Sequence, residues 1–184
     1  MTDQLDRDNG RVATTDSERP RRADGAVQDT LAVLGSYLVL GVLCGLAWWL
    51  LVEPAMFTKL EGGGSMGEVE LGKRFDADAW YAVIAALAGF LSGGLIGWWR
   101  SRDLLLTTGL LLVGAGIAAA VMAVTGYLLG PGDPDAALAA AKVGEQVGVQ
   151  LEVTARAAYL VWPISALIGG LIVLWSSPSR DRAS

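Results

Sequence analysis

Four long blocks of apolar residues without a single charged side chain set the strongest constraint on how this chain folds. They cover residues 31–52, 79–99, 104–129 and 157–175. A charge at the centre of a membrane-spanning helix costs roughly 2.5–3.5 kcal/mol on insertion scales, and about 20 apolar residues cross the hydrocarbon core as a helix. We therefore predict an all-α membrane protein, a bundle of four transmembrane helices.

The polar segments divide the chain into three parts. We predict a disordered cytoplasmic tail over residues 1–28, where no apolar period supports a fold. The transmembrane domain then covers residues 29–176, and residues 177–184 form a second cytoplasmic tail. The first block is longer than the apolar region of a signal peptide, about 7–15 residues, which favours a spanning helix over a cleaved leader.

The two long connections, residues 53–78 and 130–156, carry signals of local structure. In the first, 57–60 and 68–71 flank a glycine-rich turn and are predicted to pair as a hairpin, and Asp78 is predicted to cap the second helix. In the second, 136–143 predicts a short helix, and the alternation over 147–153 predicts a half-buried strand. The two loops are therefore predicted to form a small β/α cap.

The distribution of basic residues predicts the orientation. The two tails and the short turn at 100–103 hold nine Lys and Arg, whereas the two long loops hold five. Cytoplasmic segments carry the excess of basic residues. We therefore predict a multi-pass protein of the cell (plasma) membrane, with cytoplasmic N- and C-termini and two extracytoplasmic loops.

Aromatic side chains cluster near the ends of the blocks. Tyr and Trp favour the membrane–water interface, and we interpret these residues as interfacial anchors; the alternative is an aromatic ligand groove. The residues near the predicted outer ends are Trp48, Trp49, Trp80, Tyr81, Tyr127, Tyr159 and Trp162, and those near the inner ends are Trp98, Trp99 and Trp175.

Small residues recur every four positions in two of the blocks. Such rows let helix backbones approach closely within a membrane. Two interpretations are open: packing inside the bundle, or a seam for a partner or a second copy. The residues are Gly41 and Gly45 in the first block, and Ala85, Gly89, Gly93 and Gly97 in the second.

Pro163 falls about two turns into the last predicted helix. A proline at such a position removes one backbone hydrogen bond and usually kinks the helix. The kink is either a functional hinge or a matter of helix shape alone.

The residue inventory excludes several kinds of chemistry. The chain has no histidine and one cysteine, Cys44, so it forms no internal disulfide, no zinc site based on His or paired Cys, and no imidazole catalyst. The acidic residues of the first loop do not follow a calcium-loop spacing. Coupled transporters keep ionisable groups at membrane depth, and these blocks have none. We predict no catalytic, cofactor-binding or metal-binding residues and no cofactor.

Four short motifs carry a resemblance to a known family. They are Glu53-Pro54, Arg74-Phe75-Asp76-Ala77-Asp78, Gly97-Trp98-Trp99-Arg100 and Leu160-Val161-Trp162-Pro163. On these motifs the chain resembles a family of uncharacterised four-helix membrane proteins from actinobacteria, assigned to a domain of unknown function. The resemblance covers about residues 31–175. It implies a bacterial four-helix membrane domain and no particular activity.

We therefore expect a non-enzymatic integral membrane protein, a subunit or scaffold of a cell-envelope assembly. The alternative is a small transporter or channel component that is active as an oligomer. The expected partners are the lipid bilayer and other membrane proteins or a second copy of the chain. With a net charge of −5, nucleic acid is not expected as a partner.

Overall fold

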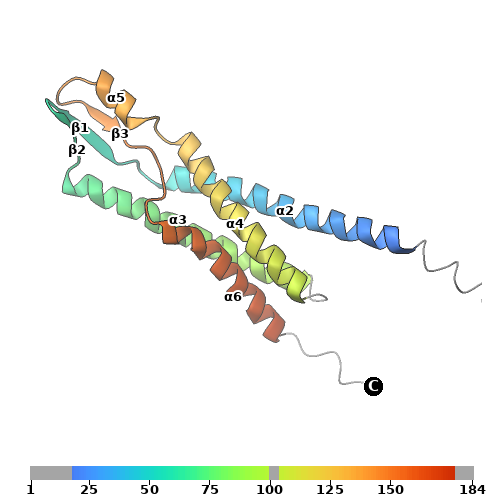
Figure 1. Ribbon diagram of the computed structural model, residues 1–184. Coiled ribbons are helices and arrows are strands. Elements are labelled where there is room, and N and C mark those ends of the chain that lie inside the picture. The colour runs from blue at the N-terminus through green and yellow to red at the C-terminus, as the bar shows by residue number, and fades with distance from the viewer. Residues whose placement is uncertain (1–17, 100–103, 177–184) are drawn as a thin grey trace, which may run out of the picture. The chain divides into compact units, whose positions relative to one another are not determined.

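A computed structural model describes residues 18–99 and 104–176 of the chain, with side chains from residue 27 onward. The described chain is mostly helical, with one small sheet (Figure 1). The helices are α2 (Glu18–Leu51), α3 (Glu68–Trp99), α4 (Leu104–Leu129), α5 (Pro134–Ala140), the 3₁₀ helix η1 (Arg156–Leu160) and α6 (Val161–Ser176). The strands are β1 (Met56–Leu60), β2 (Gly63–Ser65) and β3 (Gln146–Gly148).

Four helical segments among the described residues are long and apolar enough to cross a membrane. They are Val27–Leu51, Glu68–Trp99, Leu105–Ala140 and Arg156–Ser176. The predicted architecture, mainly helical with four apolar helices and a small β element, is confirmed at this level.

The chain divides into two compact units, residues 1–35 and 36–184. In the first unit, α2 begins at Glu18, so the prediction of a disordered tail is wrong for residues 18–28. Pro20 lies in the first turn of α2, where the N–H that proline lacks has no intrahelical partner. The rest of the first tail, the second tail and the turn at 100–103 lie outside the described residues.

Within residues 36–176, two helix pairs pack closely. The buried face of α3 repeats every four residues, from Ala77 and Tyr81 to Gly97, and its glycines face α6. Figure 1 shows α6 running beside α3. Gly41 and Gly45 of α2 face α4. The core is built from small side chains and a few large ones, among them Tyr37, Trp48, Met122 and Trp162.

The second helix begins eleven residues before the predicted Ala79, at Glu68. Five of its eleven added residues are Glu, Lys, Arg or Ala, which favour helix. Glu68 and Glu70 lie in the first turn, where negative charge is favourable. The alternation at 68–71 therefore did not indicate a strand. The predicted hairpin is right in its first strand and wrong in its second.

The sheet is antiparallel, in the order β2-β1-β3. β1 pairs with Gly63–Ser65, and Leu60 lies opposite Gly63 across a two-residue turn. On its other edge β1 pairs with β3, where Phe57 lies opposite Val147. The predicted strand over 147–153 is thus shorter and begins at Gln146. The predicted short helix appears as α5, Pro134–Ala140.

Three of the predicted interfacial aromatics belong to the core. Trp48, Tyr81 and Trp162 are fully buried, because each lies on a helix face that meets another helix. Others of the set are exposed, as a side chain at the membrane–water interface must be; among them are Trp49, Trp80, Tyr127, Trp98, Trp99 and Trp175.

Pro163 lies in the first turn of α6, which begins at Val161. The prediction that it lies two turns inside the last helix is wrong, because residues 156–160 form a 3₁₀ helix. The first N–H groups of an α-helix have no partner within the helix, so Pro163 costs α6 no hydrogen bond.

Candidate functional site

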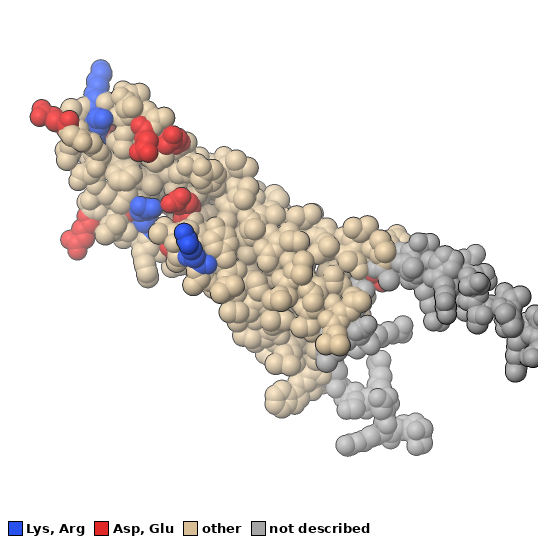
Figure 2. All heavy atoms as spheres, in the orientation of Figure 1, with Lys and Arg blue, Asp and Glu red and all other residues tan. Residues whose placement is uncertain are grey.

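The charged residues of the second unit gather at one end. We call this end the cap and define it as residues 52–78 and 130–156, which include the sheet, α5 and the polar first turns of α3. Every charged residue in 36–99 and 104–176 lies within these two ranges. Figure 2 shows red and blue side chains over the end that carries the sheet, and a surface of uncharged residues along the helices next to it. The cap is the part of the described chain with side chains suited to polar recognition or chemistry.

Glu70 of α3 holds the chain that leaves α2. Its carboxylate accepts a hydrogen bond from the N–H of Met56 at 2.7 Å and pairs with Nζ of Lys73 at 3.1 Å. These contacts, led by the Met56 N–H, lower the pKa of the Glu70 carboxyl. The ionised carboxylate therefore fixes the start of β1 to the first turns of α3.

Asp78 holds the second loop. Its two carboxylate oxygens accept hydrogen bonds from the N–H groups of Thr154 and Ala155, both at 3.0 Å. Asp78 is not the helix cap that was predicted, because α3 continues for ten residues before it. Instead it binds the extended segment that precedes η1. One helix thus anchors both loops of the cap.

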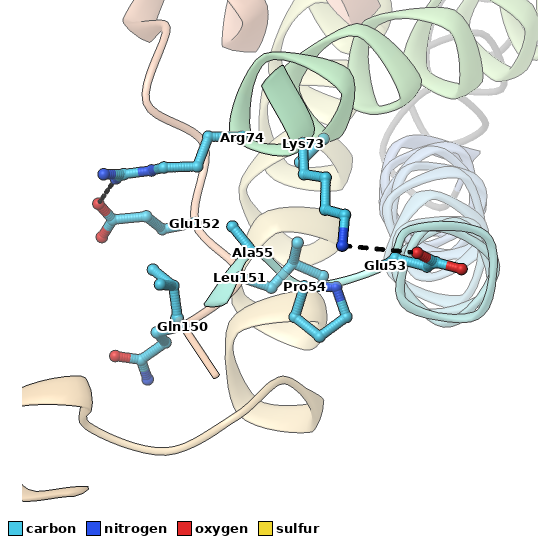
Figure 3. Close-up of a pocket in the computed structure, with 10 residues that line it drawn as sticks. Glu53, Pro54, Ala55, Lys73, Arg74, Gln150, Leu151 and Glu152 are labelled. Carbon is cyan, nitrogen blue, oxygen red and sulfur yellow. Dashed lines mark ion pairs between the residues drawn. The ribbon is translucent and has the colours of Figure 1, made fainter. Parts of the chain in front are cut away.

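Two further ion pairs flank a small cavity (Figure 3). Arg74 pairs with Glu152 at 3.5 Å, and Lys73 reaches Glu53 at 3.8 Å. The figure shows the Lys73 and Arg74 side chains pointing in different directions, each toward its own carboxylate. The cavity volume is about 20 Å³, which is room for about one water molecule. A substrate does not fit there.

Below the cap, three aromatic residues join the helices. Trp48 and Tyr81 meet edge to face with ring centroids 5.3 Å apart, and Tyr159 lies 5.8 Å from Tyr81. Nε1 of Trp48 donates to the Ala77 carbonyl at 2.9 Å, and the Tyr81 hydroxyl donates to the Ala119 carbonyl at 2.7 Å. Because these donors find carbonyls of neighbouring helices, the cluster fixes α2, α3 and α4 to one another.

The structure places the predicted packing residues at contacts within the chain. A Cβ on Gly41 would lie 2.8 Å from the Ala118 carbonyl oxygen, and one on Gly45 would lie 2.7 Å from that of Met122. On α3, Ala85 is fully buried. A Cβ on Gly89 would meet the Trp162 carbonyl oxygen, one on Gly93 would meet the Ala166 backbone, and one on Gly97 would meet Gly170.

The chemistry open to the cap follows from these contacts. Glu70 and Asp78 accept hydrogen bonds from backbone N–H groups, and Glu152 is paired with arginine. Carboxylates held in this way stabilise the loops that they contact, and these contacts occupy their acceptor oxygens. Among the residues that the structure describes, no group of three or more potential metal ligands comes together.

Sequence reasoning missed the anchoring roles of Glu70 and Asp78. The i,i+3 spacing of Glu70 and Lys73 was a signal for a helix at 68–73. Nothing in the sequence pointed to the bond between Asp78 and Thr154, which are 76 residues apart.

Comparison with protein families, curated proteins and solved structures finds no match to this chain. The resemblance to the actinobacterial family therefore stays a prediction.

Proposed function

We propose that this chain is a non-enzymatic, multi-pass protein of the cell membrane that serves as a subunit or scaffold of a cell-envelope assembly. One observation carries the proposal. The anchoring carboxylates of the cap, Glu70, Asp78 and Glu152, hold loop backbone or a neighbouring side chain. The polar end of the protein is therefore a fixed surface for contact.

The membrane placement combines two arguments. Four helices have the length and composition to cross a bilayer, and the basic residues favour the tails and the short turn by nine to five. By the positive-inside rule the tails lie in the cytoplasm. The cap then lies on the outer side.

Two features of the helices support a scaffold role over a transport role. The contact between α3 and α6 brings backbones together at Gly93 and Gly97, which leaves little space for a path between these two helices. Coupled transporters keep ionisable groups at membrane depth, whereas no Asp, Glu, Lys or Arg occurs in the apolar stretches 31–52, 79–99, 104–129 and 157–175. The resemblance to actinobacterial four-helix membrane proteins agrees with a bacterial membrane protein and adds no activity.

Site-specific photo-cross-linking in native membranes tests the proposal. A photoreactive residue at position 75 lies on the cap, where the Phe75 side chain is 76% exposed. A matched probe at position 95 lies in the apolar stretch of α3, where Leu95 is 63% exposed. We expect the first probe to give a defined protein adduct and the second to give mainly lipid adducts.

The competing role is tested with the purified protein. If it carries ion or solute flux in liposomes by itself, and neither probe captures a protein that co-purifies in fixed stoichiometry, the scaffold proposal is wrong. A small transporter would then be the better interpretation.

A further inference from the structure

A groove larger than the cavity of Figure 3 lies where α2 ends and α3 begins. Its volume is about 470 Å³, within the range of about 300–1,000 Å³ typical of ligand sites. One wall is the end of α2 with Leu51 and the adjoining Val52 and Glu53; the other is α3 from Val69 to Trp80. Its size alone admits a small organic group.

The lining of the groove is amphiphilic. Leu51, Val69 and Trp80 are apolar, whereas Glu53, Lys73 and Asp76 are charged. Leu51 and Trp80 belong to the apolar stretches of their helices, and the charged residues belong to the polar segment that joins these stretches. The groove therefore lies at the change from apolar to polar surface.

The charges of the groove favour a cationic group. Lys73 is the only cation among the residues that line it, and its ammonium is already paired with Glu70 at 3.1 Å and Glu53 at 3.8 Å. The Glu53 side chain is 86% exposed, and Asp76 is exposed as well. Glu70, which makes the shorter contact, balances the charge of Lys73. The exposed carboxylates of Glu53 and Asp76 then leave the groove net negative, which attracts an amine and repels a net anion.

We propose that this groove binds the headgroup of an outer-leaflet phospholipid that carries a primary amine, of the phosphatidylethanolamine class. Its ammonium is received by Asp76 and Glu53, and its acyl chains run along Leu51 and Trp80. A primary ammonium has N–H donors for charge-assisted hydrogen bonds to carboxylates; a choline headgroup lacks them. The proposal rests on the membrane placement proposed above.

Native mass spectrometry of the full-length protein in detergent micelles tests this site. The probes are phosphatidylethanolamine, phosphatidylcholine and phosphatidylglycerol with identical acyl chains. Because Glu53 and Asp76 are exposed to water, one net hydrogen bond to them corresponds to about threefold to tenfold in affinity. We expect phosphatidylethanolamine to bind more tightly than phosphatidylcholine by about this factor, and phosphatidylglycerol to bind most weakly.

Asp76→Asn keeps the shape of the side chain and removes its charge, so we expect the preference for phosphatidylethanolamine to fall toward one. The matched control is Asp135→Asn, which makes the same change on α5, outside the groove, and should keep the wild-type preference. Glu53→Gln is a second variant in the groove and should reduce the preference in the same way. Thermal unfolding of each variant shows that it is folded.

Equal binding of the three lipids by the wild-type protein would overturn the proposal, as would a preference for the anionic lipid. A preference that survives both groove substitutions in folded protein would overturn it too. Lipid selectivity is measured on the protein in micelles, whereas the scaffold proposal is tested by cross-linking in native membranes. A negative result in one experiment therefore does not decide the other proposal.

Discussion

Neighbouring glycines of α3 differ sharply in the space around them. A Cβ at Gly93 would meet the backbone of Ala166 on α6, whereas one at Gly94 would lie 3.7 Å from the nearest atom of Val173, an ordinary contact. We predict that Gly93→Ala pushes α3 and α6 apart and lowers the free energy of unfolding by about 1–3 kcal/mol. Thermal unfolding in detergent, followed by circular dichroism, measures the change.

Gly94→Ala is the control for this prediction. It adds the same methyl group one position along the helix, and alanine favours helix over glycine by up to about 1 kcal/mol. Its thermal stability should equal or exceed that of the wild type. Equal stability of the two variants would mean that α3 and α6 do not approach as closely as the structure describes.

At Asp78, one carboxylate serves two N–H groups, those of Thr154 and Ala155. In Asp78→Asn the amide NH₂ cannot accept, so one of the two N–H groups loses its partner; because both bonds are exposed, the cost is about 0.5–1.5 kcal/mol. The loop that leads to Arg156 should then loosen. We predict faster trypsin cleavage after Arg156, followed by mass spectrometry of the fragments.

Asp76→Asn is the matched control for cleavage, because Asp76 lies on the same helix and is exposed. It should be cut at the wild-type rate. If the two variants are cut equally fast, Asp78 does not restrain the loop.

At the scale of elements, hydropathy predicts the helices well where their residues are continuously apolar. The predicted ends of the helix 104–129 agree with those observed, and so does the predicted end of α3 at Trp99. The start of α3 differs, because the helix already runs from Glu68 to Asp78, through polar residues that hydropathy alone assigns to a loop. The strand β2 was missed because glycine residues, which weaken strands, make up most of it.

The Glu70 contact predicts how the cap responds to pH. The pKa of Glu70 is lowered in the folded protein, so its contribution to stability is complete above the ordinary glutamate pKa of about 4.3. That contribution is lost as the pH falls through the lowered value. We predict that Glu70→Gln destabilises the protein at pH 7 and that its difference from the wild type shrinks below about pH 4.

The measurement is the midpoint of thermal unfolding between about pH 7 and pH 3, a range that brackets the carboxyl titration. Glu61→Gln is the comparison, since Glu61 lies exposed in the turn between β1 and β2. A difference between Glu70→Gln and wild type that stays constant with pH would contradict the role given to the ionised carboxylate.

At the scale of the whole molecule, the sequence predicts which helices can pack closely, but it does not predict which helix each of them packs against. The glycine rows at Gly41 and Gly89 indicate close packing, yet only the three-dimensional structure shows that the first faces α4 and the second faces α6. The groove at the start of α3 could not be predicted either, because it is lined by residues of two helices that a loop separates in the sequence, such as Leu51 and Asp76. Such pairings depend on how helices pack, which local periodicity does not encode.

The proposed topology makes a prediction about which side of the membrane each connection faces. In a Cys44→Ala background, Ser65→Cys places a thiol on β2 of the cap, where the residue is exposed, and Ser101→Cys places one in the short basic segment 100–103. With the cap outside, a membrane-impermeant maleimide should label intact cells at position 65 and not at position 101. Permeabilised cells should be labelled at both positions, which controls for reactivity. The reverse pattern would invert the topology and place the cap, with its lipid groove, at the cytoplasmic leaflet.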